Sequence, residues 1–167
     1  MVQDLEQYYE QYEKAQNDPE QMEEWQKWGD RKYQACQNKR DYDQYKECGF
    51  TEEPTFNKYG WVNTRIPKDT IEEIKIFGEE GGHSSSVECA QLPNGKWVSG
   101  YRYFLSISGA SCGCSIWGKQ YDSRIKALTD KIRQIVDHIK RSDRATDRTY
   151  LPKLYEAMDN VRQLSLF

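Results

Sequence analysis

The sequence predicts an α+β protein in which a three- to four-stranded antiparallel sheet packs against one long amphipathic helix. Two observations carry this prediction. Between residues 70 and 117 apolar side chains tend to recur at every second position, which is the period of a strand. Between residues 122 and 141 they recur at helical spacing. An N-terminal helical segment precedes the sheet, and a C-terminal tail helix follows the long helix.

The sequence of 167 residues divides into four segments. Residues 1–49 are predicted to be helical, acidic and rich in Gln, Tyr and Trp, and residues 50–69 to be a connector. Residues 70–142 form the sheet-plus-helix core, and residues 143–167 form the C-terminal helix and its tail. Hydrophobic content is low at 37%, but the 13% of aromatic residues can build a compact core with polar edges.

Two or three short helices are expected in the first segment. Asp18 is expected to cap a helix that starts at Pro19 and ends near Gly29, and a third helix is expected to end at Gly49. Aromatic residues recur along these helices at helical spacing. They include Tyr8, Tyr9, Tyr12, Trp25 and Trp28. Such a stripe is typical of a core, and the alternative is an exposed docking face.

The sheet is expected to begin with an edge strand, because Ile74 and Ile76 alternate with charged residues. Val87 and Cys89 begin a second strand. Pro93-Asn94-Gly95 then predicts a tight hairpin, since Asn-Gly tolerates positive φ at both turn centres.

A long third strand is predicted from Trp97 to Ile107, followed by a loop of small residues at 109–113 and a fourth strand at 115–117. Asp122 or Ser123 is expected to cap the long helix. Its apolar stripe consists of Ile125, Leu128, Ile132, Ile135, Val136 and Ile139. A last helix is expected around residues 151–162.

The net charge of −3 conceals a charge asymmetry. Residues 1–60 carry 14 acidic and 8 basic side chains, which suits a basic protein surface. The acidic docking residues proposed there are Glu20, Glu23 and Glu24. Residues 122–153 carry 5 acidic and 9 basic side chains, which suits phosphates. Ordinary solvated helix faces are the alternative explanation for both.

A nucleic-acid surface would use the basic residues of the long helix and of the segment after it. These are Lys126, Arg133, Lys140, Arg141, Arg144 and Arg148. Aromatic residues of the sheet could stack on bases if their face is open: Tyr101, Tyr103 and Trp117, beside Arg102. The acidity of the whole chain counts against nucleic-acid binding as the primary function.

No catalytic residue, cofactor or metal site is assigned, and the sequence does not predict an enzyme. The phosphate-loop, dinucleotide and zinc-protease motifs are absent. His83 lies in a Ser-rich stretch that fits a hairpin loop. Cys112 and Cys114 could join Cys36 and Cys48 in a zinc site, but their spacing matches no standard zinc pattern.

Five irregularly spaced cysteines, no secretory signal and no membrane span predict a cytoplasmic protein.

The sequence ends in Gln163-Leu164-Ser165-Leu166-Phe167. This pentamer resembles the peptide with which bacterial replication and repair proteins hold the DNA sliding clamp, or beta clamp. The preferred pattern is Gln-Leu, then Ser or Asp, then Leu-Phe, and all five positions match it. The resemblance implies that Leu166 and Phe167 fill an apolar pocket of the clamp, while the Gln163 amide fixes the register. Alternatively, the apolar residues of the pentamer fold back as core.

Together, the small size, the lack of catalytic signatures and this peptide look like an accessory protein of a phage or plasmid. The expected function is to bind the sliding clamp in the cytoplasm of a bacterial host, either recruiting the folded part to DNA or blocking other clamp clients. One alternative is an inhibitor of a host defence nuclease, of anti-CRISPR or anti-restriction type, that docks through residues 1–47. The other is a small DNA- or RNA-binding module that uses the basic residues.

Overall fold

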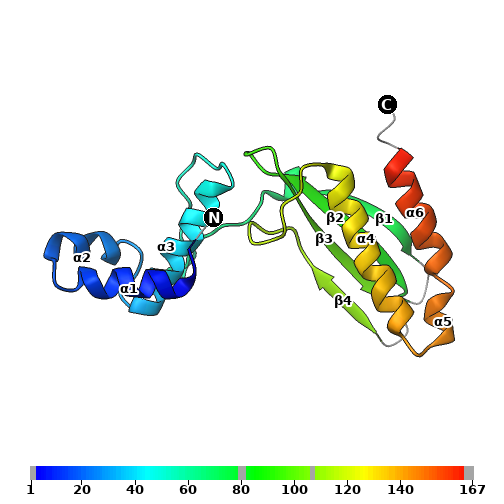
Figure 1. Ribbon diagram of the computed structural model, residues 1–167, viewed down its shortest axis with the longest axis horizontal. Helices are drawn as coiled ribbons and strands as arrows, with labels where there is room; N and C mark the ends of the chain where they lie inside the picture. Colours follow the sequence, from blue (N-terminus) through cyan, green and yellow to red (C-terminus); the bar gives the residue numbers. More distant parts are fainter. Residues whose placement is uncertain (1–2, 79–81, 106–107, 164–167) are drawn as a thin grey trace. The chain divides into compact units, whose positions relative to one another are not determined.

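The computed structural model describes residues 3–78, 82–105 and 108–163, and it confirms the predicted α+β class (Figure 1). The chain contacts group into two compact units, residues 1–65 and residues 66–167. Each unit has a hydrophobic core of its own. No helix in the described ranges combines the length and the apolar composition that a bilayer-spanning segment needs.

The N-terminal unit contains α1 (Leu5–Ala15), α2 (Pro19–Gln26) and α3 (Lys32–Glu47). The predicted start of α2 is confirmed, because the Asp18 carboxylate accepts hydrogen bonds from the backbone N–H groups of its first turn. Pro19 follows at the position where a missing N–H costs nothing.

The aromatic stripe of this unit is largely core, as predicted. Tyr8 and Tyr12 of α1 are buried against Ala35 and Cys36 of α3. Trp25 packs edge-on against Tyr12, with ring centroids 5.4 Å apart. The small residues on α3 make room for the large rings on α1, so the core is asymmetric in side-chain size.

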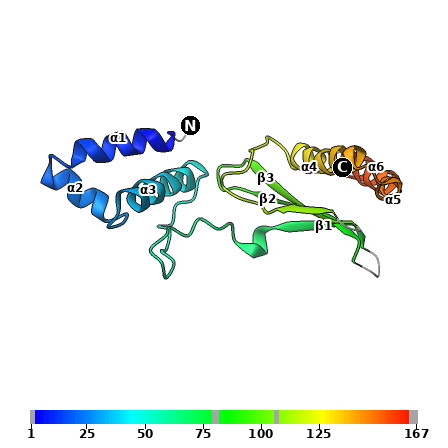
Figure 2. The ribbon, with the colours of Figure 1, turned by 90° about the horizontal axis from the view of Figure 1, so that it is seen from below.

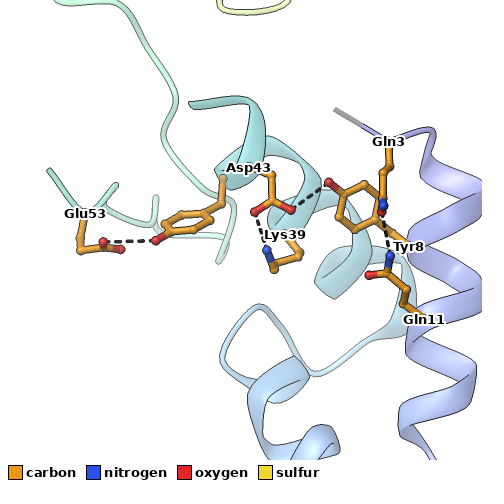
Figure 3. Close-up of polar contacts among 7 residues, drawn as sticks. Gln3, Tyr8, Gln11, Lys39, Asp43 and Glu53 are labelled. Atoms are coloured by element: carbon orange, nitrogen blue, oxygen red, sulfur yellow. Dashed lines mark hydrogen bonds and ion pairs between the residues drawn. The ribbon is translucent and has the colours of Figure 1, made fainter. Parts of the chain in front are cut away.

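Polar side chains fix α1 to α3 (Figure 3). The Tyr8 hydroxyl donates to Asp43 Oδ2 at 2.9 Å, and Lys39 pairs with the same carboxylate. Burial, with the adjacent Asp43 carboxylate, raises the pKa of Tyr8, so its hydroxyl remains a donor at any physiological pH. Tyr42 donates to Glu53 at 3.2 Å, which holds the segment after α3 against the helix.

Asn38 organises the rest of this unit from a fully buried position on α3. Its Nδ2 donates to the carbonyl oxygen of Trp28 and, at 2.7 Å, to that of Gly60. Its Oδ1 accepts from the backbone N–H of Val62 at 3.0 Å. One amide therefore joins the α2–α3 junction to the turn that follows α3.

The C-terminal unit is built on an antiparallel sheet with the strand order β1-β2-β3-β4. Its strands are β1 (Glu72–Gly78), β2 (Ser84–Gln91), β3 (Trp97–Phe104) and β4 (Gly109–Cys112), and the 3-10 helix η1 (Lys68–Thr70) precedes them. β1 lies at an edge, as predicted. The register places Val87 of β2 between Ile74 of β1 and Tyr101 of β3.

The predicted position of the fourth strand was wrong. Residues 115–117 form a turn, and β4 instead occupies the small-residue stretch predicted as a loop. The small residues permit close strand contact, because a Cβ on Gly109 of β4 would come within 2.9 Å of the Tyr103 carbonyl oxygen on β3. Ile116, whose apolar character suggested a strand, is buried in a loop.

The β2–β3 hairpin is tight but of a different type from the prediction. The Gly95 N–H donates to the Leu92 carbonyl oxygen at 2.8 Å, and Gly95 has a φ of 82° while Asn94 keeps a negative φ. Pro93 fixes its own φ near −65°, which a turn with positive φ at both centres cannot accept. The connection is therefore a type I turn followed by a left-handed glycine.

Helices α4 (Arg124–Arg141), α5 (Ala145–Arg148) and α6 (Leu151–Gln163) cover one face of the sheet (Figure 2). Ser123 caps α4 by accepting from the Lys126 N–H at 3.3 Å. The predicted apolar stripe of α4 is buried against β2 and β3 except for Ile125, which is half-buried, and α6 lies beside α4. The core of this unit therefore lies between the sheet and these two helices.

Candidate functional site

Gln163 is the one residue of the clamp-like pentamer that falls within the described ranges, and Leu164, Ser165, Leu166 and Phe167 lie outside them. Gln163 is the last residue of α6, and its side chain is exposed. The buried residues of α6 end at Val161. The pentamer therefore begins two residues after the last core contact of the helix.

The acidic residues proposed for docking all lie on α2. Glu20, Glu23 and Glu24 are exposed, while Met22 and Trp25 of the same helix pack against the core. Glu24 pairs with Lys27. The helix therefore presents a carboxylate face to solvent. The basic surface of a partner protein could bind this face.

The basic residues named from the sequence are all exposed, but they do not act as one strip. Near the end of α4, Lys140 lies 5.6 Å from the Tyr155 ring centroid, and Arg148 donates to the Ser142 carbonyl oxygen at 3.0 Å. These cations stabilise the α4–α5–α6 region. Lys126 and Arg133 lie nearer the start of α4, where both line a cavity.

This cavity, the α4 cavity, is open to solvent and has a volume of about 380 Å³. It is lined by residues of α4, of the loop before α4 and of the end of α6. The lining residues are Lys119, Tyr121, Ile125, Lys126, Thr129, Asp130, Arg133 and Arg162. Four cationic side chains therefore surround one carboxylate.

Asp130 has partners of its own within the fold. It accepts hydrogen bonds from the Tyr121 hydroxyl and, at 3.0 Å, from Gln134 Nε2, and Lys119 lies 3.9 Å away. Burial favours the neutral acid, but the Tyr121 hydrogen bond and the Lys119 charge outweigh it and hold the pKa of Asp130 below its usual range. Asp130 is thus ionised. Its carboxylate already interacts with Lys119 and with two neutral hydrogen-bond donors.

The other cations of the α4 cavity differ in their protein partners. The side chains of Lys126 and Arg133 make no hydrogen bond or ion pair with any described residue, whereas Arg162 pairs with Asp159 at 3.4 Å and is half exposed. Thr129 adds a polar atom, because its buried Oγ1 has no hydrogen-bond partner in the described part of the chain. The cavity therefore has unbalanced positive charge.

The aromatic platform considered for the sheet does not form. Alternation along β3 places Tyr101 and Tyr103 on the face that α4 covers and Arg102 on the opposite face. The Tyr101 ring centroid lies 5.7 Å from Lys131 Nζ and 6.2 Å from the ring of His138, both on α4. These tyrosines consequently support the helix rather than offer a stacking surface.

The thiols and the Ser-rich stretch show no chemical activation. Burial raises the pKa of Cys36 to about 11 and the pKa values of Cys89 and Cys114 to about 12, so these thiols stay protonated at neutral pH. His83 Nδ1 lies 2.7 Å from the Tyr150 hydroxyl, a contact at the edge of the core. Within the described ranges, no three or more His, Cys, Asp or Glu side chains are grouped to hold a metal ion.

Sequence analysis missed an aromatic groove in the N-terminal unit. A second open cavity, of about 410 Å³, is lined by Tyr33, Tyr59 and Trp61 together with Asp30, Arg31 and Gln34. Gln34 stabilises this groove by donating hydrogen bonds to the carbonyl oxygens of Tyr59 and Gly60 at 3.0 Å.

Lys119 and Arg162 of the α4 cavity were also not predicted from the sequence, because only tertiary packing brings their segments to α4.

Comparisons of this chain with protein-family models, with curated proteins and with solved structures find no match.

Proposed function

We propose that this chain is a non-enzymatic accessory protein of a phage or plasmid, and that it binds the bacterial sliding clamp through residues 163–167. The five-position match of this peptide carries the proposal. The position of the peptide supports it, since Gln163 is exposed and follows the last buried residue of α6. Binding there would leave the core of the C-terminal unit undisturbed.

The chemistry of the peptide fits an anchor in a pocket. Leu166 and Phe167 would bury two apolar side chains, and a few such residues carry most of the energy of an interface. Ser165 is small and lets the backbone approach the partner, while the Gln163 amide offers donors and an acceptor at the rim. A peptide of five residues offers few anchors, so affinity in the micromolar range and fast exchange are expected.

Titration calorimetry with a purified bacterial sliding clamp tests the proposal. The intact protein should bind, and the variant with Leu166→Ala and Phe167→Ala should lose binding while melting as the wild type does. Ser165→Asp is the matched control, because the preferred pattern accepts Asp there, and it should retain binding. A synthetic peptide of residues 158–167 should bind weakly and compete with the intact protein.

Two results would reject the clamp proposal. One is the absence of binding by the intact protein at concentrations of tens of micromolar, a range that detects any interaction stronger than about −6 kcal/mol. The other is a melting temperature lowered by several degrees in the double alanine variant, since this would place Leu166 and Phe167 in the core.

The exposed carboxylate face of α2 supports a second candidate function. The side chains of Glu20 and Glu23 make no hydrogen bond or ion pair with any residue in the described ranges, and they would be available to a basic channel of a host defence nuclease. In that case the protein would inhibit the nuclease by occupying its nucleic-acid path, and within residues 1–47 the carboxylates of α2 would make the contact.

A further inference from the structure

We infer that the α4 cavity binds the phosphates of a nucleic-acid backbone. The inference does not depend on clamp binding, because it uses different residues of the C-terminal unit. It rests on the cationic residues Lys119, Lys126, Arg133 and Arg162, which three separate segments bring to one concave surface.

The spacing of the cations fits a ligand with several phosphates. Lys126 and Arg133 are seven residues apart on one helix face, which corresponds to about 10.5 Å along the axis. A nucleic-acid strand rises by about 3.4 Å per phosphate, so this distance spans about three nucleotides.

The side chains of Lys126 and Arg133 in the α4 cavity are available to an external anion. Asp130 is the one carboxylate in the lining, and its hydrogen bonds from Tyr121 and Gln134 and its contact with Lys119 occupy it. Neither Lys126 nor Arg133 has an ion-pair partner among the residues with described positions. An approaching phosphate would therefore gain charge–charge attraction without breaking an existing pair of either residue.

Because the whole chain is acidic, its binding to nucleic acid should depend on the α4 cavity. The net charge of −3 repels nucleic acid at long range, so a diffuse attraction over the whole surface is not expected. Binding should instead depend on the few residues of the cavity, and removing two of its cations should have a large effect. The basic residues at the far end of α4 provide the comparison.

Fluorescence anisotropy with the full-length protein and a labelled oligonucleotide of about 20 nucleotides, single-stranded or duplex, tests the inference at several salt concentrations. Lys126→Gln with Arg133→Gln should weaken binding by about tenfold or more at low salt, and the slope of log affinity against log salt should fall by about two. Lys140→Gln with Arg141→Gln makes the same charge change at the other end of α4. This control pair should leave the affinity within about twofold and the slope unchanged.

Three outcomes would overturn the inference. The first is no oligonucleotide binding by the wild type at low salt, and the second is equal weakening by the two glutamine pairs. The third is binding of pyrophosphate as tight as binding of the oligonucleotide, which would make the site one for small phosphate compounds. The variant Leu166→Ala with Phe167→Ala should still bind the oligonucleotide, so failure of the clamp proposal is distinguishable from failure here.

Discussion

At the scale of single residues, Asn38 shows how one buried side chain can define a unit. Asn38→Ala removes the hydrogen bonds to the Trp28 carbonyl and the Val62 N–H, whereas the Gly60 carbonyl keeps its bond from Gln34. Leaving buried backbone groups unpaired costs about 1–3 kcal/mol each, so for these two groups we expect a loss of about 2–6 kcal/mol in the N-terminal unit.

Hydrogen exchange of the α3 amides measures this loss directly, because their protection reports the opening free energy of the unit. Asn63→Ala is the matched control. Asn63 is exposed, and the same substitution there should change stability by less than about 0.5 kcal/mol. Unchanged α3 protection in Asn38→Ala would show that the amide does not organise the unit.

A second residue-scale prediction concerns the pair of Glu72 on β1 and Arg124 on α4. Arg124 Nε donates to Glu72 Oε2 at 2.8 Å, and Arg124 Nη2 pairs with the other carboxylate oxygen. The hydrogen bond from Arg124 outweighs burial and lowers the pKa of Glu72. The folded state therefore binds this proton less readily than the unfolded state, so the stabilisation is present at neutral pH and disappears as pH falls through the lowered pKa.

Glu72→Gln should therefore reduce stability at pH 7 by no more than about 1 kcal/mol, since Glu72 is half exposed. The gap to the wild type should close as pH falls below the ordinary glutamate pKa of about 4.3. Thermal melts at several pH values follow this gap. A gap for Glu72→Gln that stays constant with pH would contradict the assignment.

At the scale of elements, α4 contributes five buried residues to the core of the C-terminal unit. Ile132, a residue of α4, is fully buried in the core between this helix, α6 and the sheet. Ile132→Ala removes buried apolar surface and leaves a cavity, so it should cost about 2–4 kcal/mol. Urea denaturation followed by circular dichroism gives this value, with the exposed Arg141→Ala as control at less than about 0.5 kcal/mol. A wild-type midpoint in Ile132→Ala would refute the packing of α4.

Periodicity predicted the elements that bury one regular face. The stripe of α4 and the alternation around Val87 gave correct elements, because burial on one face imposes the period of the element on the sequence. β4 could not be predicted in this way. Its residues Gly109–Cys112 have small side chains with weak strand preference, and pairing with β3 positions them. Ile116 misled the prediction, since a loop can bury an apolar residue as well as a strand can.

At the scale of the whole molecule, the sequence located half of the cations of the α4 cavity. Lys126 and Arg133 follow from helix geometry alone, because residues seven apart lie on one face. Lys119 and Arg162 flank α4 in the sequence on opposite sides, and they reach it only through the packing of α6 and of the loop before α4. Local patterns therefore predict a charged face, whereas a concave site requires the fold.

The clamp proposal and the nuclease alternative assign binding to opposite ends of the sequence, and one set of variants separates them. Glu20→Lys with Glu23→Lys reverses the carboxylate face of α2, while Glu24 stays in place because it pairs with Lys27. Glu6→Lys with Glu10→Lys is the matched control, since these exposed residues occupy the first turn and the middle of α1. Both pairs change the net charge equally.

If the clamp proposal is correct, both charge-reversed proteins should bind the sliding clamp within about twofold of the wild type in calorimetry, because the apolar anchors Leu166 and Phe167 carry the interface energy. If the nuclease alternative is correct, the α2 reversal should relieve inhibition of a CRISPR or restriction nuclease in a DNA-cleavage assay, and most strongly at low salt, where charge attraction is least screened. The α1 reversal and the double alanine variant at Leu166 and Phe167 should leave that inhibition intact.

Loss of clamp binding on α2 reversal, with retention on α1 reversal, would instead place a clamp contact on α2. It would show that residues 163–167 are not the whole clamp-binding site.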